Sequence, residues 1–114
     1  MAEEKQFEMK VKRYLNERGC WVVKYFGNGY TPSGIPDLLA CVNGYFVAIE
    51  VKASTGHPSD LQLYNRKKIR EAGGISLVLY PHQFDDFKLL IDDLIERPQR
   101  LDWNDQKHFD KEGE

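Results

Sequence analysis

Apolar residues recur with helical spacing in three segments of the chain. In the first segment they occupy the i, i+4, i+7 and i+8 positions of one helix face, namely Phe7, Val11, Tyr14 and Leu15. Gly19 predicts the end of this helix. A second helix is predicted from Pro58, at its first position, to the Gly73-Gly74 pair, and a third over residues 83–96.

Short runs rich in β-branched and aromatic residues predict strands over residues 20–26, 37–42, 45–53 and 75–80. Segment 27–36 is rich in glycine and proline and predicts a loop. The expected order is therefore α-β-β-β-α-β-α. A helix between the third and fourth strands predicts a parallel crossover, so we expect an α/β fold with a mixed four-stranded sheet flanked by helices.

The Asn43-Gly44 pair predicts a two-residue hairpin turn, because both positions of a type I′ turn need positive φ. Such a turn fixes the register of the two strands and places Asp37 opposite Glu50. Because side chains alternate along a strand, Lys52 lies on the same face. The hairpin thus brings two carboxylates and a lysine together at one end of an otherwise apolar pair of strands.

Two carboxylates that lie directly opposite each other repel and weaken the pairing of their strands. A divalent cation bound between them makes the same arrangement favourable. Mg²⁺ is typically held by one or two carboxylates together with water and phosphate oxygens. The pattern therefore predicts a metal site at Asp37 and Glu50, with Lys52 beside it to hold a water or offset charge on a reacting phosphate. The alternative is that Glu50 and Lys52 form an ordinary ion pair near a strand end.

Composition constrains the function only weakly. The formal net charge is −2, and residues 102–114 hold five acidic and two basic residues, so any nucleic-acid contact must come from local patches. Cys20 and Cys41 lack a metal-ligand spacing and are predicted to be reduced and buried. There is neither a signal sequence nor a membrane-length apolar run, which predicts a cytoplasmic protein without membrane contact. No phosphate-binding motif suggests a nucleotide cofactor.

The segments "GIPDLL" and "IEVK", followed by a helix opening with "LQ", resemble the PD-(D/E)xK nuclease superfamily. Within it the chain is most similar to VRR-NUC (virus-type replication-repair nuclease) domains, which resemble archaeal Holliday-junction resolvases. The resemblance covers residues 4–90. It implies a restriction-endonuclease-like core and a single nuclease domain over residues 1–97, followed by an acidic tail over residues 98–114.

The resemblance also implies roles for individual residues. Asp37, Glu50 and the Val51 carbonyl would bind Mg²⁺ or Mn²⁺, Lys52 would position the attacking water, and Gln62 would lie near the active site. Family members also carry a glutamate on the first helix. The "FE" match points to Glu8 as a metal ligand, whereas helical spacing alone places Glu4 on the buried stripe and Glu8 on its rim.

Several residues are candidates for DNA contact. Basic side chains on the second predicted helix are by default interpreted as a solvated helix face, but they also suit phosphate contacts. Residues of the first strand and of the loop before Asp37 could also approach a nucleic-acid backbone. The candidates are Lys24, Tyr30, Ser33, Arg66, Lys67 and Arg70.

The sequence thus predicts a metal-dependent DNA endonuclease acting on branched DNA in replication, repair or recombination, with a virus or phage among the expected sources. One active site per chain favours a homodimer for cutting two strands. Two alternatives remain open. The chain could be a non-catalytic nucleic-acid-binding subunit, or a nickase or single-strand nuclease that works with a helicase.

Overall fold

The structure is a computed structural model that describes residues 2–27, 29–98 and 106–110. The predicted boundary between a domain of residues 1–97 and a tail of residues 98–114 stays a prediction, because residues 99–105 and 111–114 of that tail lie outside the described residues.

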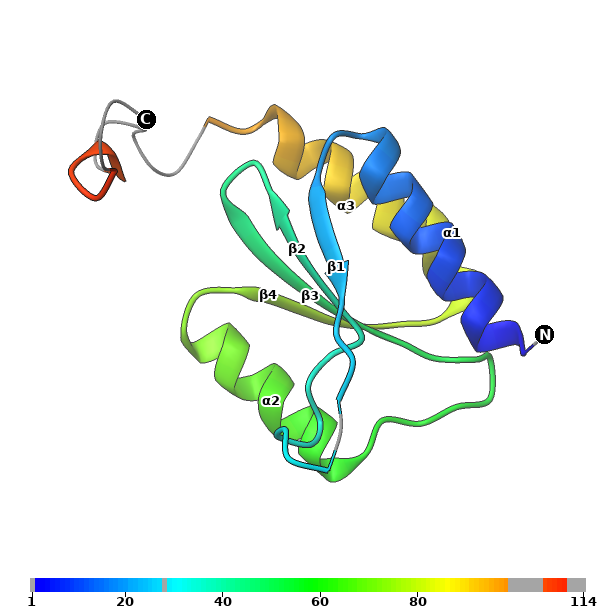
Figure 1. The fold of residues 1–114 in the computed structure, drawn as a ribbon. Helices are drawn as coiled ribbons and strands as arrows, with labels where there is room; N and C mark the ends of the chain where they lie inside the picture. The colour runs from blue at the N-terminus through cyan, green and yellow to red at the C-terminus, as the bar shows by residue number, and fades with distance from the viewer. Residues whose placement is uncertain (1, 28, 99–105, 111–114) are drawn as a thin grey trace.

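The fold is α/β with the predicted order of elements, as Figure 1 shows. The elements are α1 (Glu3–Glu17), β1 (Trp21–Lys24), β2 (Leu38–Val42), β3 (Tyr45–Val51), α2 (Asp60–Glu71), β4 (Ile75–Leu79), the 3₁₀ turn η1 (Pro81–Gln83) and α3 (Phe84–Glu96). The strands form one sheet in the order β1-β2-β3-β4, with antiparallel pairs except for the parallel pair β3–β4. This mixed sheet confirms the predicted fold class.

Helices cover the two faces of the sheet unequally. Helices α1 and α3 lie side by side against one face, whereas α2 packs on the other face beside β4 (Figure 1). Alternate residues of β2 and β3 enclose the core with apolar residues of α1 and α3, namely Leu38, Ala40, Val42, Val47, Ile49, Val51, Val11, Leu15, Ile91 and Leu94. Strand β3 is central, and its last five residues are buried on both faces.

The predicted hairpin turn and register are confirmed. Asn43 and Gly44 have φ values of 50° and 84°, and Val42 pairs with Tyr45 and Leu39 with Ala48. The turn also contacts α3, because the Asn43 side-chain amide donates to the carbonyls of Leu94, Ile95 and Arg97 at 2.9, 3.3 and 2.6 Å. The Leu94 carbonyl also accepts from the Arg97 backbone amide at 3.3 Å. The Asn43 side chain adds a donor for the carbonyls at the end of α3, so it caps this helix from a distant part of the chain.

Replacing Asn43 should therefore destabilise the fold through α3. Asn43→Gly keeps the left-handed backbone and removes only the cap, which should cost about 1 kcal/mol. Asn43→Asp adds a negative charge facing three carbonyls at a helix C-terminus and should cost about 2–3 kcal/mol. Urea unfolding of both variants measures this difference, and equal stabilities would contradict the capping role.

The start of α2 differs from the prediction. The helix begins at Asp60 with Ser59 as its N-cap, so Pro58 precedes the helix and does not occupy its first position. The Ser59 hydroxyl accepts from the Gln62 amide, and the Gln62 side chain accepts from the Ser59 amide. This capping box satisfies two backbone donors and fixes the start of the helix.

Part of the α2 face of the sheet is left open. Register places Trp21, Cys41 and Phe46 in one row across β1, β2 and β3. Trp21 and Phe46 are 61% and 45% exposed, and Cys41 is exposed as well. The prediction that Cys41 is buried was therefore wrong, because α2 covers the β4 side of this face and leaves the β1–β2 side bare. Both cysteines are free.

Candidate active site

Asp37 directly precedes β2 and lies at the end of the sheet where β3 carries Glu50 and Val51. Its carboxylate oxygen Oδ2 accepts a hydrogen bond from the backbone amide of Val51 at 2.9 Å. The backbone amide of Tyr25, just after β1, donates to the Asp37 carbonyl at 2.8 Å. Asp37 is thus held from both neighbouring strands, next to Glu50 as the hairpin register predicts.

Glu50 is the one charged side chain in the buried interior of the described residues, with 4% exposure. Its Oε2 accepts from the Gln62 amide at 2.7 Å and lies 3.3 Å from the Lys52 ammonium. Its Oε1 is buried and has no hydrogen-bond partner among the described residues. Burial, and then the neighbouring charge of Asp37, raise the pKa of Glu50 to about 7.

Lys52 is fixed at the same end of β3. Its backbone amide donates to the Leu79 carbonyl of β4 at 3.0 Å, and its side chain is largely buried beside Glu50. The segment that follows is also held, because Glu3 at the start of α1 accepts from the amide and the hydroxyl of Ser54 at 2.9 and 2.6 Å. These bonds lower the pKa of Glu3, with the bond from the Ser54 hydroxyl as the larger cause.

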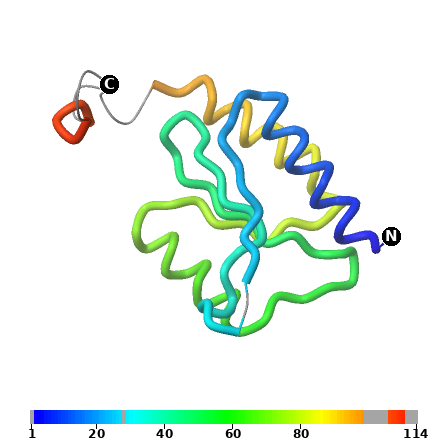
Figure 2. Tube along the Cα trace, viewed as in Figure 1, coloured from blue at the N-terminus to red at the C-terminus, as the bar shows by residue number. Residues whose placement is uncertain are grey.

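Helix α2 connects Glu50 with the loop before Asp37. Gln62 binds Glu50, and one turn later the Asn65 amide donates to the carbonyls of Ser33 and Gly34 at 3.3 and 3.1 Å. Gly34 has a φ of 78°, and a Cβ placed there would lie 2.7 Å from the Leu61 backbone. Only glycine fits this close approach, so the loop passes directly against the start of α2 (Figure 2).

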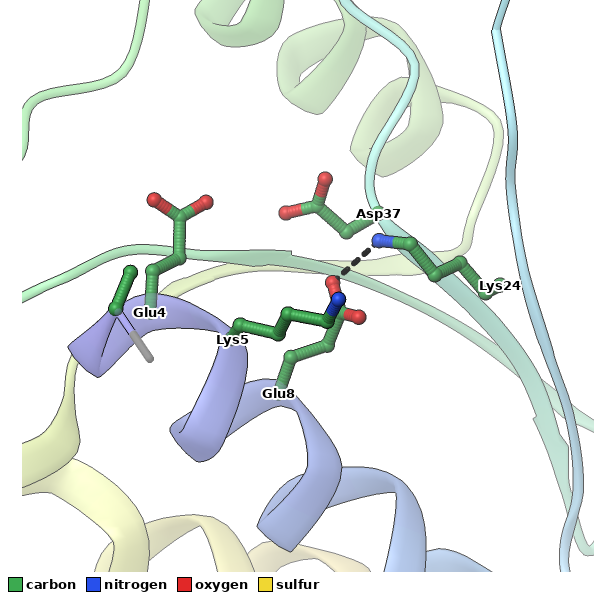
Figure 3. Close-up of a pocket in the computed structure, with 6 residues that line it drawn as sticks. Glu4, Lys5, Glu8, Lys24 and Asp37 are labelled. Atoms are coloured by element: carbon green, nitrogen blue, oxygen red, sulfur yellow. Dashed lines mark hydrogen bonds and ion pairs between the residues drawn. The ribbon is translucent and has the colours of Figure 1, made fainter.

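A pocket of about 320 Å³ opens beside Asp37. Figure 3 shows its charged side chains, contributed by α1, β1 and the residue before β2, namely Glu4, Lys5, Glu8, Lys24 and Asp37. The Lys24 ammonium lies 2.6 Å from Glu8 Oε1. Glu4 and Glu8 both line the pocket, so the choice between them as a site residue stays open.

The residues present fit a hard divalent cation. Among the described residues, no three His, Cys, Asp or Glu side chains gather as a complete ligand set. However, Asp37 and Glu50 supply two adjacent carboxylates, and the buried Oε1 of Glu50 lacks a hydrogen-bond partner in the described part of the chain. Mg²⁺ commonly takes one or two carboxylates and completes its shell with water and phosphate oxygens.

The six residues predicted to contact DNA are dispersed over the molecule. Tyr30 and Ser33 lie in the exposed loop before Asp37, and Arg66 and Lys67 lie on α2, where Lys67 is 4.0 Å from Glu71. The Arg70 guanidinium donates twice to the Ser76 carbonyl, at 3.1 and 2.7 Å. Of the six candidates, only Lys24 lines the pocket beside Asp37.

Sequence reasoning missed Asn65 and Glu3. The signal for Asn65 was available, because it follows Gln62 by three residues and so shares its helix face. No pattern in the sequence indicated that Glu3 holds Ser54, which is distant along the chain.

The element order and the mixed sheet are consistent with a restriction-endonuclease-like fold, the class to which PD-(D/E)xK-type nucleases belong. Residues 2–103 match the sequence model described as archaeal Holliday junction resolvase (hjc), and the chain belongs to that family of junction-resolving nucleases. This match supports the resolvase relationship but not the narrower resemblance to VRR-NUC domains. No curated protein and no solved structure matched.

In the part of the chain that the structure describes, every helix is too short or too polar to cross a bilayer.

Proposed function

We propose that this protein is a divalent-metal-dependent endonuclease that cuts branched DNA, with Asp37, Glu50 and Lys52 at its active site. The observation that carries the proposal is the buried Glu50, whose Oε1 has no hydrogen-bond partner among the described residues while the Asp37 carboxylate lies near it. Burying two like charges together is costly unless a cation or a proton offsets them.

In this proposal Asp37, Glu50 and the Val51 carbonyl hold Mg²⁺ or Mn²⁺, with Glu8 as a further ligand. When bound, the cation lowers the pKa of a water and stabilises negative charge on the phosphate oxygens. Gln62 fixes Glu50 by donating to Oε2 at 2.7 Å. Lys52, also against Oε2, can turn its remaining N–H donors toward a water or a phosphate oxygen.

Cleavage of labelled DNA tests the proposal. The substrates are a four-way junction, a flap, a single strand and a duplex of matched sequence, each with Mg²⁺, Mn²⁺ or EDTA. We expect cutting with either metal, none in EDTA, and a preference for the junction of at least about tenfold over the duplex, the discrimination that about 1.4 kcal/mol of differential binding provides. Binding without cutting under every condition would favour a non-catalytic subunit, and preference for the single strand would favour a nuclease that works with a helicase.

We further propose a homodimer formed through the open sheet face. The row of Trp21, Cys41 and Phe46 is apolar, exposed and three strands wide, and Val23 beside it is 36% exposed. Contiguous apolar patches on a soluble protein commonly mark interaction sites. An uncharged patch of this kind is compatible with self-association about a two-fold axis.

Replacing Trp21 with lysine should therefore convert a dimer into a monomer, because each copy would bring a charge into the apolar contact. Light scattering after size exclusion measures the mass, and Leu89→Lys, on the exposed side of α3 (68% exposed), serves as the control. In the wild type a short bismaleimide should link the Cys41 side chains of the two copies. A wild-type monomer, or a dimer that survives Trp21→Lys, would contradict this interface.

A further inference from the structure

The ion pair between Lys24 and Glu8 lies inside the pocket that contains Asp37. The Lys24 ammonium is 2.6 Å from Glu8 Oε1, and the side chains are only 29% and 13% exposed. Lys24 ends β1, and the amide of the next residue, Tyr25, bonds the Asp37 carbonyl. The backbone that places Lys24 on Glu8 is thus the backbone that positions Asp37.

The pocket around the Lys24–Glu8 ion pair has an excess of negative charge. Glu4, Glu8 and Asp37 contribute three carboxylates against the two ammonium groups of Lys5 and Lys24. A lysine bound to Glu8 supplies the positive charge that a divalent cation would otherwise supply, so the two compete for the same carboxylate. Lys24 also has a neighbour on the solvent side, because its ammonium is 5.6 Å from the ring centre of Phe26, which is 78% exposed.

We propose that Lys24 is a positioning residue that holds Glu8 until DNA arrives. In the free protein Lys24 neutralises Glu8 and keeps it from the Asp37–Glu50 site. A DNA phosphate then takes the ammonium, and Glu8 becomes available as the further ligand. The inference rests on the proposed function and adds a means of regulation to it, because the full ligand set forms only with substrate in place.

Binding of Mn²⁺ alone to the DNA-free full-length protein, measured by calorimetry, tests this coupling. We expect Lys24→Gln to bind Mn²⁺ about three- to tenfold more tightly than the wild type, the range that a partly exposed ion pair can supply. Lys24→Arg keeps the pair and should retain wild-type affinity. Lys5→Gln removes an equal charge from the same pocket but leaves the Lys24–Glu8 ion pair in place. It should change the affinity less than about twofold, since the charge of the exposed Lys5 is screened by salt.

The gain should vanish when Lys24→Gln is combined with Glu8→Gln, because the freed carboxylate is then absent. An equal gain in Lys5→Gln, or a gain that survives Glu8→Gln, would overturn the proposal. Asp37→Asn separates this failure from failure of the proposed function. If Asp37→Asn binds Mn²⁺ as tightly as the wild type, the proposed metal site itself is wrong. If Asp37→Asn weakens Mn²⁺ binding but Lys24→Gln does not strengthen it, only the proposed role of Lys24 is wrong.

Junction binding in EDTA provides the reciprocal readout. Glu8→Gln frees Lys24 before DNA binds, so the junction should bind about three- to tenfold more tightly, because the ion pair no longer has to be broken. Glu4→Gln removes the same charge from the same pocket and should raise the affinity less than about twofold. Equal gains in these two variants would contradict the transfer of Lys24 from Glu8 to phosphate.

Discussion

Asp37→Asn should lower the rate of junction cleavage by about 10³-fold or more, because the cation it helps to hold contributes several kcal/mol of charge stabilisation in the transition state. The fold should persist, since the asparagine side-chain oxygen can still accept from the Val51 amide as Oδ2 does at 2.9 Å. Junction affinity should not fall, because the substitution removes a negative charge near the phosphates. Single-turnover cleavage and a binding titration in EDTA measure the two quantities.

The matched control is Asp85→Asn, an exposed aspartate in the first turn of α3. It should cleave like the wild type. Residual activity of Asp37→Asn within about tenfold of this control would place the chemistry elsewhere, because a lost metal ligand should cost much more. Loss of cleavage together with loss of folding would be uninformative, so circular dichroism of each variant accompanies the assay.

Glu50→Gln should have opposite effects on activity and stability. Because the pKa of Glu50 is raised to about 7, the folded protein binds more protons than the unfolded chain between about pH 4.5 and 7. The stability of the metal-free protein should therefore fall as pH rises through this window, by up to about 2–3 kcal/mol from this one group. Glutamine cannot ionise, so the stability of the variant should lack this fall with pH. Glu50→Gln should therefore be more stable than the wild type at pH 8.

Urea unfolding in EDTA at pH 5, 6, 7 and 8 measures the effect, and the difference between wild type and variant removes the contribution of other titrating groups. Adding Mg²⁺ at pH 8 should reverse the order, because only the wild type gains stability from a bound cation. If the free energies of unfolding of the two proteins differ by the same amount at every pH, the pKa of Glu50 is not raised. Cleavage by Glu50→Gln should be lost at every pH.

Much of the fold could be predicted because local signals agreed with one another. The Asn43-Gly44 turn fixed the hairpin register, and the register brought Asp37 beside Glu50. The turn chemistry acts over two residues, so it can be recognised without knowledge of the tertiary structure. The prediction that Pro58 is the first residue of the second helix was wrong, because the capping box of Ser59 and Gln62 was overlooked. The spacing of this capping box is visible in the sequence.

The rest of the site depends on contacts between distant segments. The pairing of Lys24 with Glu8 requires β1 to lie against α1, and no periodic pattern specifies that contact. The exposure of Cys41 has a similar origin. An apolar strand shows that its side chains avoid charge, but not whether a helix of the same chain covers them.

The double hydrogen bond from Arg70 to the Ser76 carbonyl has a consequence for solubility. The Leu79 carbonyl bonds β3, and since carbonyls alternate in direction along a strand, the Ser76 carbonyl faces the free side of β4. Strand β4 reads ISLVL and is the last in the sheet, so its unpaired backbone could template another chain. Arg70 occupies that position and so blocks strand addition. Whatever it contributes to DNA affinity, its loss should make the protein aggregate at lower concentration.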